Sequence, residues 1–346
     1  MASGNAIVAH FQAQARACEE LGSPFTARLC RLLPEIVGEG LIGARLADWD
    51  GDLRADALAL RLCGGLHRLV IEEVEPGLAA VYPPNMADED MLREAVAGAL
   101  ERQYVFLAAY LDNPPQTNEV ARSAMLLPGL LDVARRTSLP MSLTEIGSSA
   151  GLNLFFDRFH YAYGAREWGD RRAAVRLAPE VRGEMPELKG SIYVVDRSGC
   201  DIMPIDIRDQ DGRKRLHSYV WADQQARLTR LDAAIDTALA NRFRLEREEA
   251  GAFIYRRLAN RKAGQVAVVF HSIMWQYLPQ HSHAAIEEIL ADEGARSDSL
   301  YPMAWVRMEP LEPGAPFATL TVTLWPGGEI RHLARCDYHG RWIEAI

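Results

Sequence analysis

The residues with the clearest chemical potential follow an apolar run near the middle of the chain, in the order Thr144-Glu145-Ile146-Gly147-Ser148-Ser149-Ala150-Gly151. Glycine allows positive φ angles and lets a ligand touch the backbone. Free N–H groups at the start of a following helix can donate to a polar ligand. A carboxylate at the strand end can accept hydrogen bonds from an amine, and a nearby amide or hydroxyl can hold a carboxylate. We therefore expect a cofactor site formed by Glu145, Gly147, Ser148, Ser149, Gly151 and Asn153.

Two other interpretations of this loop stay open. One is a tight turn whose glycines serve only the backbone conformation. The other is a dinucleotide site, which needs the spacing G-x-G-x-x-G and an acidic residue about 20 positions later. Gly147, Ser149 and Gly151 do not have that spacing, so the dinucleotide site is the weaker alternative.

Polar residues also follow other candidate strands. Asp196, Asp201 and Asp206 surround a probable strand end, where a carboxylate can accept two hydrogen bonds from one diol. A solvated acidic turn is the alternative. His271 follows the strongest apolar run of the chain, and it is a candidate general base near neutral pH. For this position the alternative is a structural histidine whose hydrogen bonds are satisfied inside the protein.

A further polar cluster begins at Asn113, which can cap a helix with Pro114 at its first position. The cluster holds more hydrogen-bonding groups than a cap requires. We expect its last four residues to be presented to a substrate, and these are Gln116, Thr117, Asn118 and Glu119.

The composition limits the classes of partner. The net charge is −9 over 346 residues, and no basic stripe is interleaved with aromatic residues, so nucleic acid is a disfavoured partner and a small molecule is favoured. The five cysteines show no paired spacing, so neither a disulfide framework nor a zinc site is expected. We also expect neither a signal peptide nor a membrane-spanning segment, and a cytoplasmic location fits best.

The spacing of apolar residues along the sequence changes near residue 140. Residues 1–140 show helical periodicity, for example at Leu92, Val96 and Leu100. From Met141 onward, short apolar runs alternate with helical patterns, which indicates a mostly parallel sheet. Two alternating runs at the end are joined by Pro326-Gly327-Gly328, which predicts an antiparallel hairpin. We expect a helical lobe over 1–140 and a Rossmann-like α/β domain over 141–346.

Over most of the chain from residue 115, the sequence is similar to DUF2332, a family of uncharacterised bacterial proteins. The similar stretches are Pro115–Val120 with Arg122, Glu145–Leu154, Gly199–Asp206 and Val269–Ser272. More broadly, the order of elements and the loop after Glu145 resemble the class I S-adenosylmethionine-dependent methyltransferases. The middle glycine of their motif is replaced here by Ser149.

The methyltransferase resemblance implies roles for the candidate residues. S-adenosylmethionine is the implied cofactor, with Asp201 on its ribose hydroxyls. His271 and Tyr277 are expected to face the reacting centre, where aromatic rings can enclose a sulfonium ion. Methyl transfer depends mainly on positioning, so the lack of a catalytic triad is no objection. The alternative is a non-catalytic ligand-binding or regulatory protein that keeps the fold.

Overall fold

The computed structural model describes residues 4–38 and 40–346, which form two compact units. The first unit contains the chain up to Thr117 together with 208–229, and the second contains 118–207 and 230–346. The chain therefore passes from one unit to the other at 117/118, 207/208 and 229/230.

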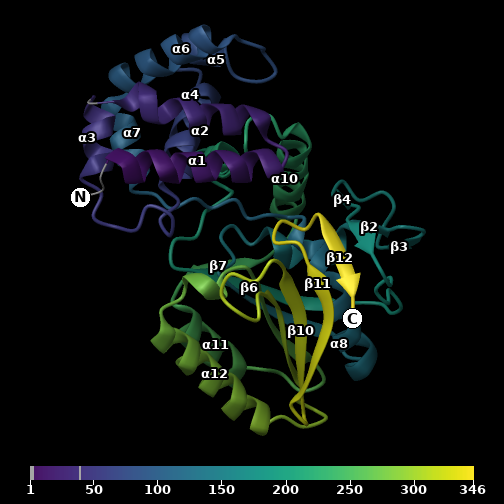
Figure 1. Cartoon of the computed structure of the whole chain (residues 1–346). Coiled ribbons are helices and arrows are strands. Elements are labelled where there is room, and N and C mark those ends of the chain that lie inside the picture. Colours follow the sequence, from purple (N-terminus) through teal and green to yellow (C-terminus); the bar gives the residue numbers. More distant parts are fainter. Residues whose placement is uncertain (1–3, 39) are drawn as a thin grey trace. The chain divides into compact units, whose positions relative to one another are not determined.

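The first unit is helical (Figure 1). Its helices are α1 (Gly4–Glu20), α2 (Pro24–Val37), α3 (Leu41–Ala47), α4 (Leu58–Ile71), α5 (Pro76–Ala79), α6 (Glu89–Arg102), α7 (Tyr104–Leu111) and α9 (Gln210–Tyr219). Apolar residues at three- and four-residue spacing form its core. Leu92, Val96 and Leu100 on α6 are buried as their spacing predicts. Asp88 caps α6 by accepting a hydrogen bond from the Met91 amide.

The second unit is built on a nine-stranded sheet with the order β5-β12-β11-β10-β9-β8-β1-β6-β7. The strands are β1 (Met141–Ile146), β5 (Glu180–Arg182), β6 (Val194–Asp201), β7 (Arg244–Arg247), β8 (Val266–Ser272), β9 (Met303–Glu309), β10 (Ala318–Trp325), β11 (Glu329–Cys336) and β12 (Trp342–Ala345). The five strands from β7 to β9 are parallel. β10, β11 and β12 continue the sheet as an antiparallel meander. The expected α/β architecture with a terminal hairpin is confirmed.

Helices cover both faces of this sheet. α8 (Arg122–Thr137) packs against β9 and β10. Gly129 allows this close approach, because a Cβ atom there would lie 3.1–3.2 Å from the side chains of Leu320, Val322 and Val306. On the other face, α11 (Ala250–Ala259) and α12 (Gln280–Ala295) contribute apolar residues to a core with β1, β6, β8 and β9. β8 is buried along almost all of its length, as expected for a parallel strand covered on both sides.

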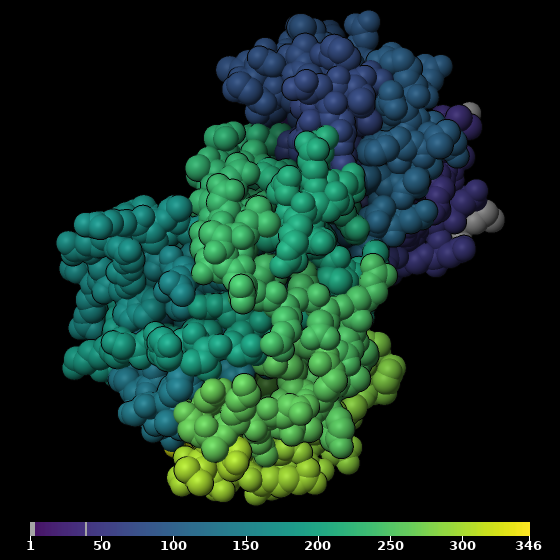
Figure 2. Space-filling view, turned by 180° about the vertical axis from the view of Figure 1, so that it is seen from behind, coloured from purple at the N-terminus to yellow at the C-terminus, as the bar shows by residue number. Residues whose placement is uncertain are grey.

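An excursion separates β1 from the next strand of the parallel group. It contains the 3₁₀ helix η1 (Leu152–Arg158) and a small sheet of β2 (His160–Tyr163), β3 (Arg166–Trp168) and β4 (Arg176–Leu177). In the space-filling view, the teal part of the chain, which includes this excursion, forms a continuous part of the surface (Figure 2). This excursion explains the long interval between Glu145 and Asp201.

Candidate functional site

The parallel strands create a topological switch point between β1 and β8. From β1 the chain adds β6 and β7 on one side, and it then adds β8 and β9 on the other side. Ligands of open α/β sheets bind outside the carboxyl ends of the strands at such a point. Glu145 lies next to the end of β1, and His271 lies next to the end of β8. The sequence-predicted residues of this loop and strand therefore do meet at one edge of the sheet.

Glu145 has an unusual environment. Its side chain is buried, and Oε2 has no hydrogen-bond partner among the described residues. Burial raises the pKa of this carboxyl group well above its ordinary value, the negative charge of Asp201 adds to the effect, and the positive charge of Arg122 opposes it. A buried acceptor without a donor is rare in folded proteins and is expected at functional sites.

The loop after β1 is held by hydrogen bonds inside the protein. The amide of Ser148 donates to the carbonyl of Cys200 at 3.0 Å, and that of Gly151 donates to the carbonyl of Ser148 at 2.7 Å. The amide of Leu152 donates to Oδ1 of Asn118 at 3.0 Å. These amides are thus occupied, so the capacity of this edge to bind a ligand lies in Glu145 more than in free backbone donors.

Asp201, at the end of β6, also holds this loop. Its Oδ2 accepts a hydrogen bond from the Ser149 amide at 2.9 Å, and its Oδ1 accepts one from the Met203 amide at 2.8 Å. Ser149 has a φ angle of +54°, although it is not glycine, and its buried Oγ has no hydrogen-bond partner in the described part of the chain. Asp201 is the last residue of β6, and its role on a ribose stays a prediction.

The segment before α8 and the first turn of α8 pack against the start of η1. Ser123 Oγ donates to Oδ1 of Asn153 at 2.7 Å, and Asn153 Nδ2 donates to the carbonyl of Glu119 at 3.4 Å. The Glu119 carboxylate accepts from the Ala121 amide and lies 3.6 Å from the Arg230 guanidinium. Of the four candidate substrate residues, Asn118 and Glu119 therefore belong to the second unit beside the loop. Gln116 and Thr117 belong to the first unit.

His271 is completely buried, and both of its ring nitrogens are engaged. Nδ1 lies 2.8 Å from Oε1 of Glu309, and Nε2 accepts a hydrogen bond from the Trp305 indole at 3.0 Å. Glu309 also accepts from the amides of Met274 and Trp275. In this arrangement His271 has no free lone pair with which to accept a proton, so a general-base role stays a prediction that requires one of these contacts to break.

The segment after β8 differs from an open aromatic enclosure. Trp275 is stacked between His271, at a centroid distance of 5.2 Å, and His283, at 4.6 Å. The side chain of Met274 covers Gly147, because a Cβ atom at Gly147 would lie 2.9 Å from Met274 Cβ. Tyr277 lies on the short helix η2 (Trp275–Tyr277) with 70% of its surface exposed. Of the two predicted catalytic residues, one is thus buried and the other faces solvent.

The backbone around this edge is strained at a second position. Ile273, directly after β8, has a φ angle of +50°, which is rare for a β-branched residue. Its amide donates to the carbonyl of Met308 at 3.1 Å. Strained residues of this kind cluster at functional sites, and here Ile273 and Ser149 follow the two strands of the switch point.

Two residues of this edge were missed from the sequence. Glu309 ends β9, and its Oε2 is buried without a hydrogen-bond partner in the described part of the chain. Arg122 begins α8, and its Nη1 donates to the carbonyl of Ser272 at 3.3 Å. The sequence does carry a signal for Glu309, because this residue is a carboxylate at the end of the apolar run that forms β9.

Two other acidic residues, Glu248 and Glu249, follow β7, and each has a local partner. Glu248 pairs with Arg256, and Glu249 caps α11.

Two kinds of feature are absent from the residues that the structure describes. None of the helices there is long and apolar enough to cross a membrane. No group of three or more His, Cys, Asp or Glu side chains in these residues is arranged to hold a metal ion.

Comparison with curated proteins gives no match, and comparison with solved structures gives none either. The model of one protein family, described as an uncharacterised protein conserved in bacteria, matches residues 8–345. That range includes almost all of the helical region, the loop after β1 and every strand of the large sheet. The chain therefore belongs to the DUF2332 family.

Proposed function

We propose that the second unit binds S-adenosylmethionine at the switch point between β1 and β8, and that the protein uses it to methylate a small molecule. One observation carries this proposal: Oε2 of Glu145, which has no partner among the described residues, lies buried at the carboxyl end of the central parallel strand. The sheet order from β7 to β9 supports it, because this order places the switch point at Glu145.

The chemistry of the cofactor fits this acceptor. S-adenosylmethionine carries an ammonium and a sulfonium group, and when bound it supplies an electrophilic methyl group. A carboxylate that lacks a donor inside the protein can accept hydrogen bonds from an ammonium group. The cation also lowers the cost of ionising Glu145, whose pKa is raised by burial. Asp201 fixes the loop beside it through the Ser149 amide.

A direct test is titration of the full chain with S-adenosylmethionine, S-adenosylhomocysteine and NAD, followed by calorimetry and thermal unfolding. We expect the first two to bind and to raise the unfolding temperature, and we expect NAD to do neither. The Glu145→Gln variant should lose at least tenfold in affinity. A matched control is Glu288→Gln, because Glu288 is exposed on α12. Absence of binding by both adenosyl compounds would contradict the proposal.

The glycine of the loop provides a second variant. Gly147 has a φ angle of +62°, so Gly147→Val introduces both backbone strain and contact with Met274. The control is Gly264→Val, because Gly264 has a φ angle of +72° but a Cβ atom added there would meet nothing within 4 Å beyond its chain neighbours. Loss of binding only in Gly147→Val would support a ligand at this loop.

A second candidate is a non-catalytic ligand-binding or regulatory protein. The occupied amides after β1 and the cover of Met274 over Gly147 favour it. The two candidates differ in turnover. After incubation with S-adenosylmethionine and a protein-free extract of bacterial small molecules, a methyltransferase releases S-adenosylhomocysteine, whereas a regulatory protein binds without releasing it.

A further inference from the structure

The first unit contains a guanidinium group with two unsatisfied donors. Nε and Nη2 of Arg215, on α9, are buried and have no hydrogen-bond partner among the residues that the structure describes. Burial of an unpaired donor opposes folding, and burial of an unpaired charge does so more strongly. A hydrogen-bond acceptor for this group must therefore come from outside the residues that the structure describes.

The two unpaired nitrogens identify the chemistry of that partner. Nε and Nη2 lie on one edge of the planar guanidinium, which donates two parallel hydrogen bonds to a carboxylate or phosphate. Elsewhere in this chain, the same edge of another arginine binds a carboxylate. Nε of Arg341 donates to Asp337 Oδ1 at 3.0 Å, and Nη2 donates to Asp337 Oδ2 at 2.8 Å. Arg215 presents this edge without the acid.

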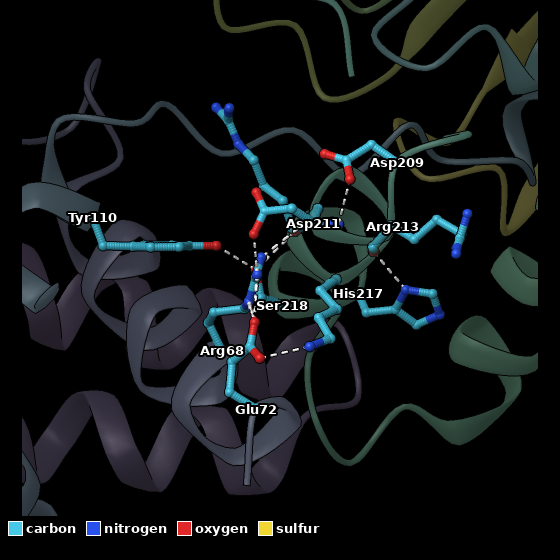
Figure 3. A network of polar contacts seen from close by, with 10 residues as sticks. Arg68, Glu72, Tyr110, Asp209, Asp211, Arg213, His217 and Ser218 are labelled. Carbon is cyan, nitrogen blue, oxygen red and sulfur yellow. Dashed lines mark hydrogen bonds and ion pairs between the residues drawn. The ribbon is translucent and has the colours of Figure 1, made fainter. Parts of the chain in front are cut away.

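The neighbouring basic residues already have their own carboxylates. Arg68, on α4, pairs with both Glu72 and Asp211, as Figure 3 shows. Lys214 Nζ lies 2.5 Å from Glu72, which it therefore shares with Arg68. No ion pair joins Arg215 to a carboxylate of the described residues, so none of these acids supplies its counter-charge.

The nearby tyrosines do not supply it either. Burial raises the pKa of both Tyr110 and Tyr219, and the positive charge of Arg215 only partly opposes that effect. Both phenols therefore stay protonated at neutral pH. Their hydroxyls are also engaged, since Tyr110 bonds to Ser218 Oγ at 2.5 Å and Tyr219 donates to the Asn113 carbonyl at 3.0 Å.

We propose that Arg215 anchors an oxyanion of a small ligand, a carboxylate or a phosphate group, in the first unit. The ligand accepts two parallel hydrogen bonds from Nε and Nη2 and supplies the missing negative charge. The residues that form this site belong to the first unit, whereas Glu145 belongs to the second unit.

The test uses the full chain and two simple anions, each titrated over a series of concentrations. Inorganic phosphate and succinate are titrated at constant ionic strength, with chloride as the reference, and thermal unfolding and calorimetry are recorded. We expect one series to raise the unfolding temperature in a saturable manner beyond chloride. A response to phosphate alone identifies a phosphate ligand, and a response to succinate alone identifies a carboxylate ligand. If neither anion exceeds chloride, the proposal is overturned.

Variants then assign the response to Arg215. Arg215→Met keeps the apolar stem and should lose the anion response at least tenfold, while the protein without ligand unfolds at a higher temperature. Arg215→Lys keeps the charge but not the two-donor edge, and it should weaken binding to a smaller extent. The control is Arg16→Met, since Arg16 is exposed on α1 of the same unit. An undiminished response in both Arg215 variants would overturn the proposal.

Discussion

The indole Nε1 of Trp305 donates a hydrogen bond to Nε2 of His271 at 3.0 Å, while Nδ1 of His271 lies 2.8 Å from the Glu309 carboxylate. An indole nitrogen can only donate, so Nε2 must accept and the ring proton lies on Nδ1. The three side chains thus fix both the tautomer and the orientation of the histidine at the end of β8.

This chain of hydrogen bonds predicts the effect of Trp305→Phe. The variant leaves Nε2 of His271 without its donor, and we expect a loss of about 1–3 kcal/mol in the free energy of unfolding, because a buried acceptor becomes unsatisfied. Trp325→Phe is the control, since it makes the same change of ring at a partly buried tryptophan that packs against the core of the same unit. Equal losses in both variants, measured by urea unfolding, would show that the hydrogen bond contributes little.

The raised pKa of Glu145 predicts a dependence of stability on pH. The folded protein binds the Glu145 proton more tightly than the unfolded chain does, because burial raises the pKa above the ordinary value of 4.5. The contribution of Glu145 to stability therefore falls as the pH rises above 4.5 toward the folded pKa. Glu145→Gln cannot titrate, so the variant should gain stability relative to the wild type as the pH rises.

The measurement is the unfolding temperature of both proteins at a series of pH values from 4.5 upward, because the folded and unfolded states bind this proton differently above the ordinary pKa. Glu288→Gln again serves as the control, because this exposed side chain should give a difference that hardly changes with pH. A constant difference between Glu145→Gln and the wild type would contradict the assigned environment of Glu145.

Ser149→Gly should stabilise the protein. Ser149 has a φ angle of +54°, and its Oγ is buried without a partner among the described residues. Removing the side chain relieves about 1 kcal/mol of strain in the left-handed backbone conformation. It also removes a buried hydroxyl that has no hydrogen-bond partner. Ser138→Gly is the matched control, since Ser138 has a φ angle of +55° but is exposed. The Ser149 variant should therefore gain about 1 kcal/mol more than the Ser138 variant in urea unfolding, and a smaller gain would mean that a partner satisfies the hydroxyl.

Much of the second unit followed from the sequence because its strands are continuous apolar runs. The strongest apolar run of the chain, which His271 follows, forms β8. The bounds of β6 are harder to predict from the sequence, because its middle contains Arg197, Ser198 and Gly199. These residues are poor strand formers by type, but pairing with β1 on one side and β7 on the other holds them extended.

The sequence indicated which polar residues follow the apolar runs, but the partners of each side chain were not predictable. The sequence indicated Glu145 and His271, since each follows an apolar run. It did not indicate that Trp305 and Glu309 would occupy both nitrogens of His271, because those contacts join residues that are 34 and 38 positions apart. α9 was also missed, because its charged sequence has no extended apolar stripe and it is stabilised by packing on α4.

The position of α8 has a practical consequence for work with fragments. A polypeptide that began at Met141 would contain every strand of the large sheet, yet it would lack the helix that covers β9 and β10. The side chains of Val306, Leu320 and Val322, which contact α8 around Gly129, would then face water. Such a fragment should be prone to aggregation, whereas one that retained residues 118–140 would keep that apolar face covered.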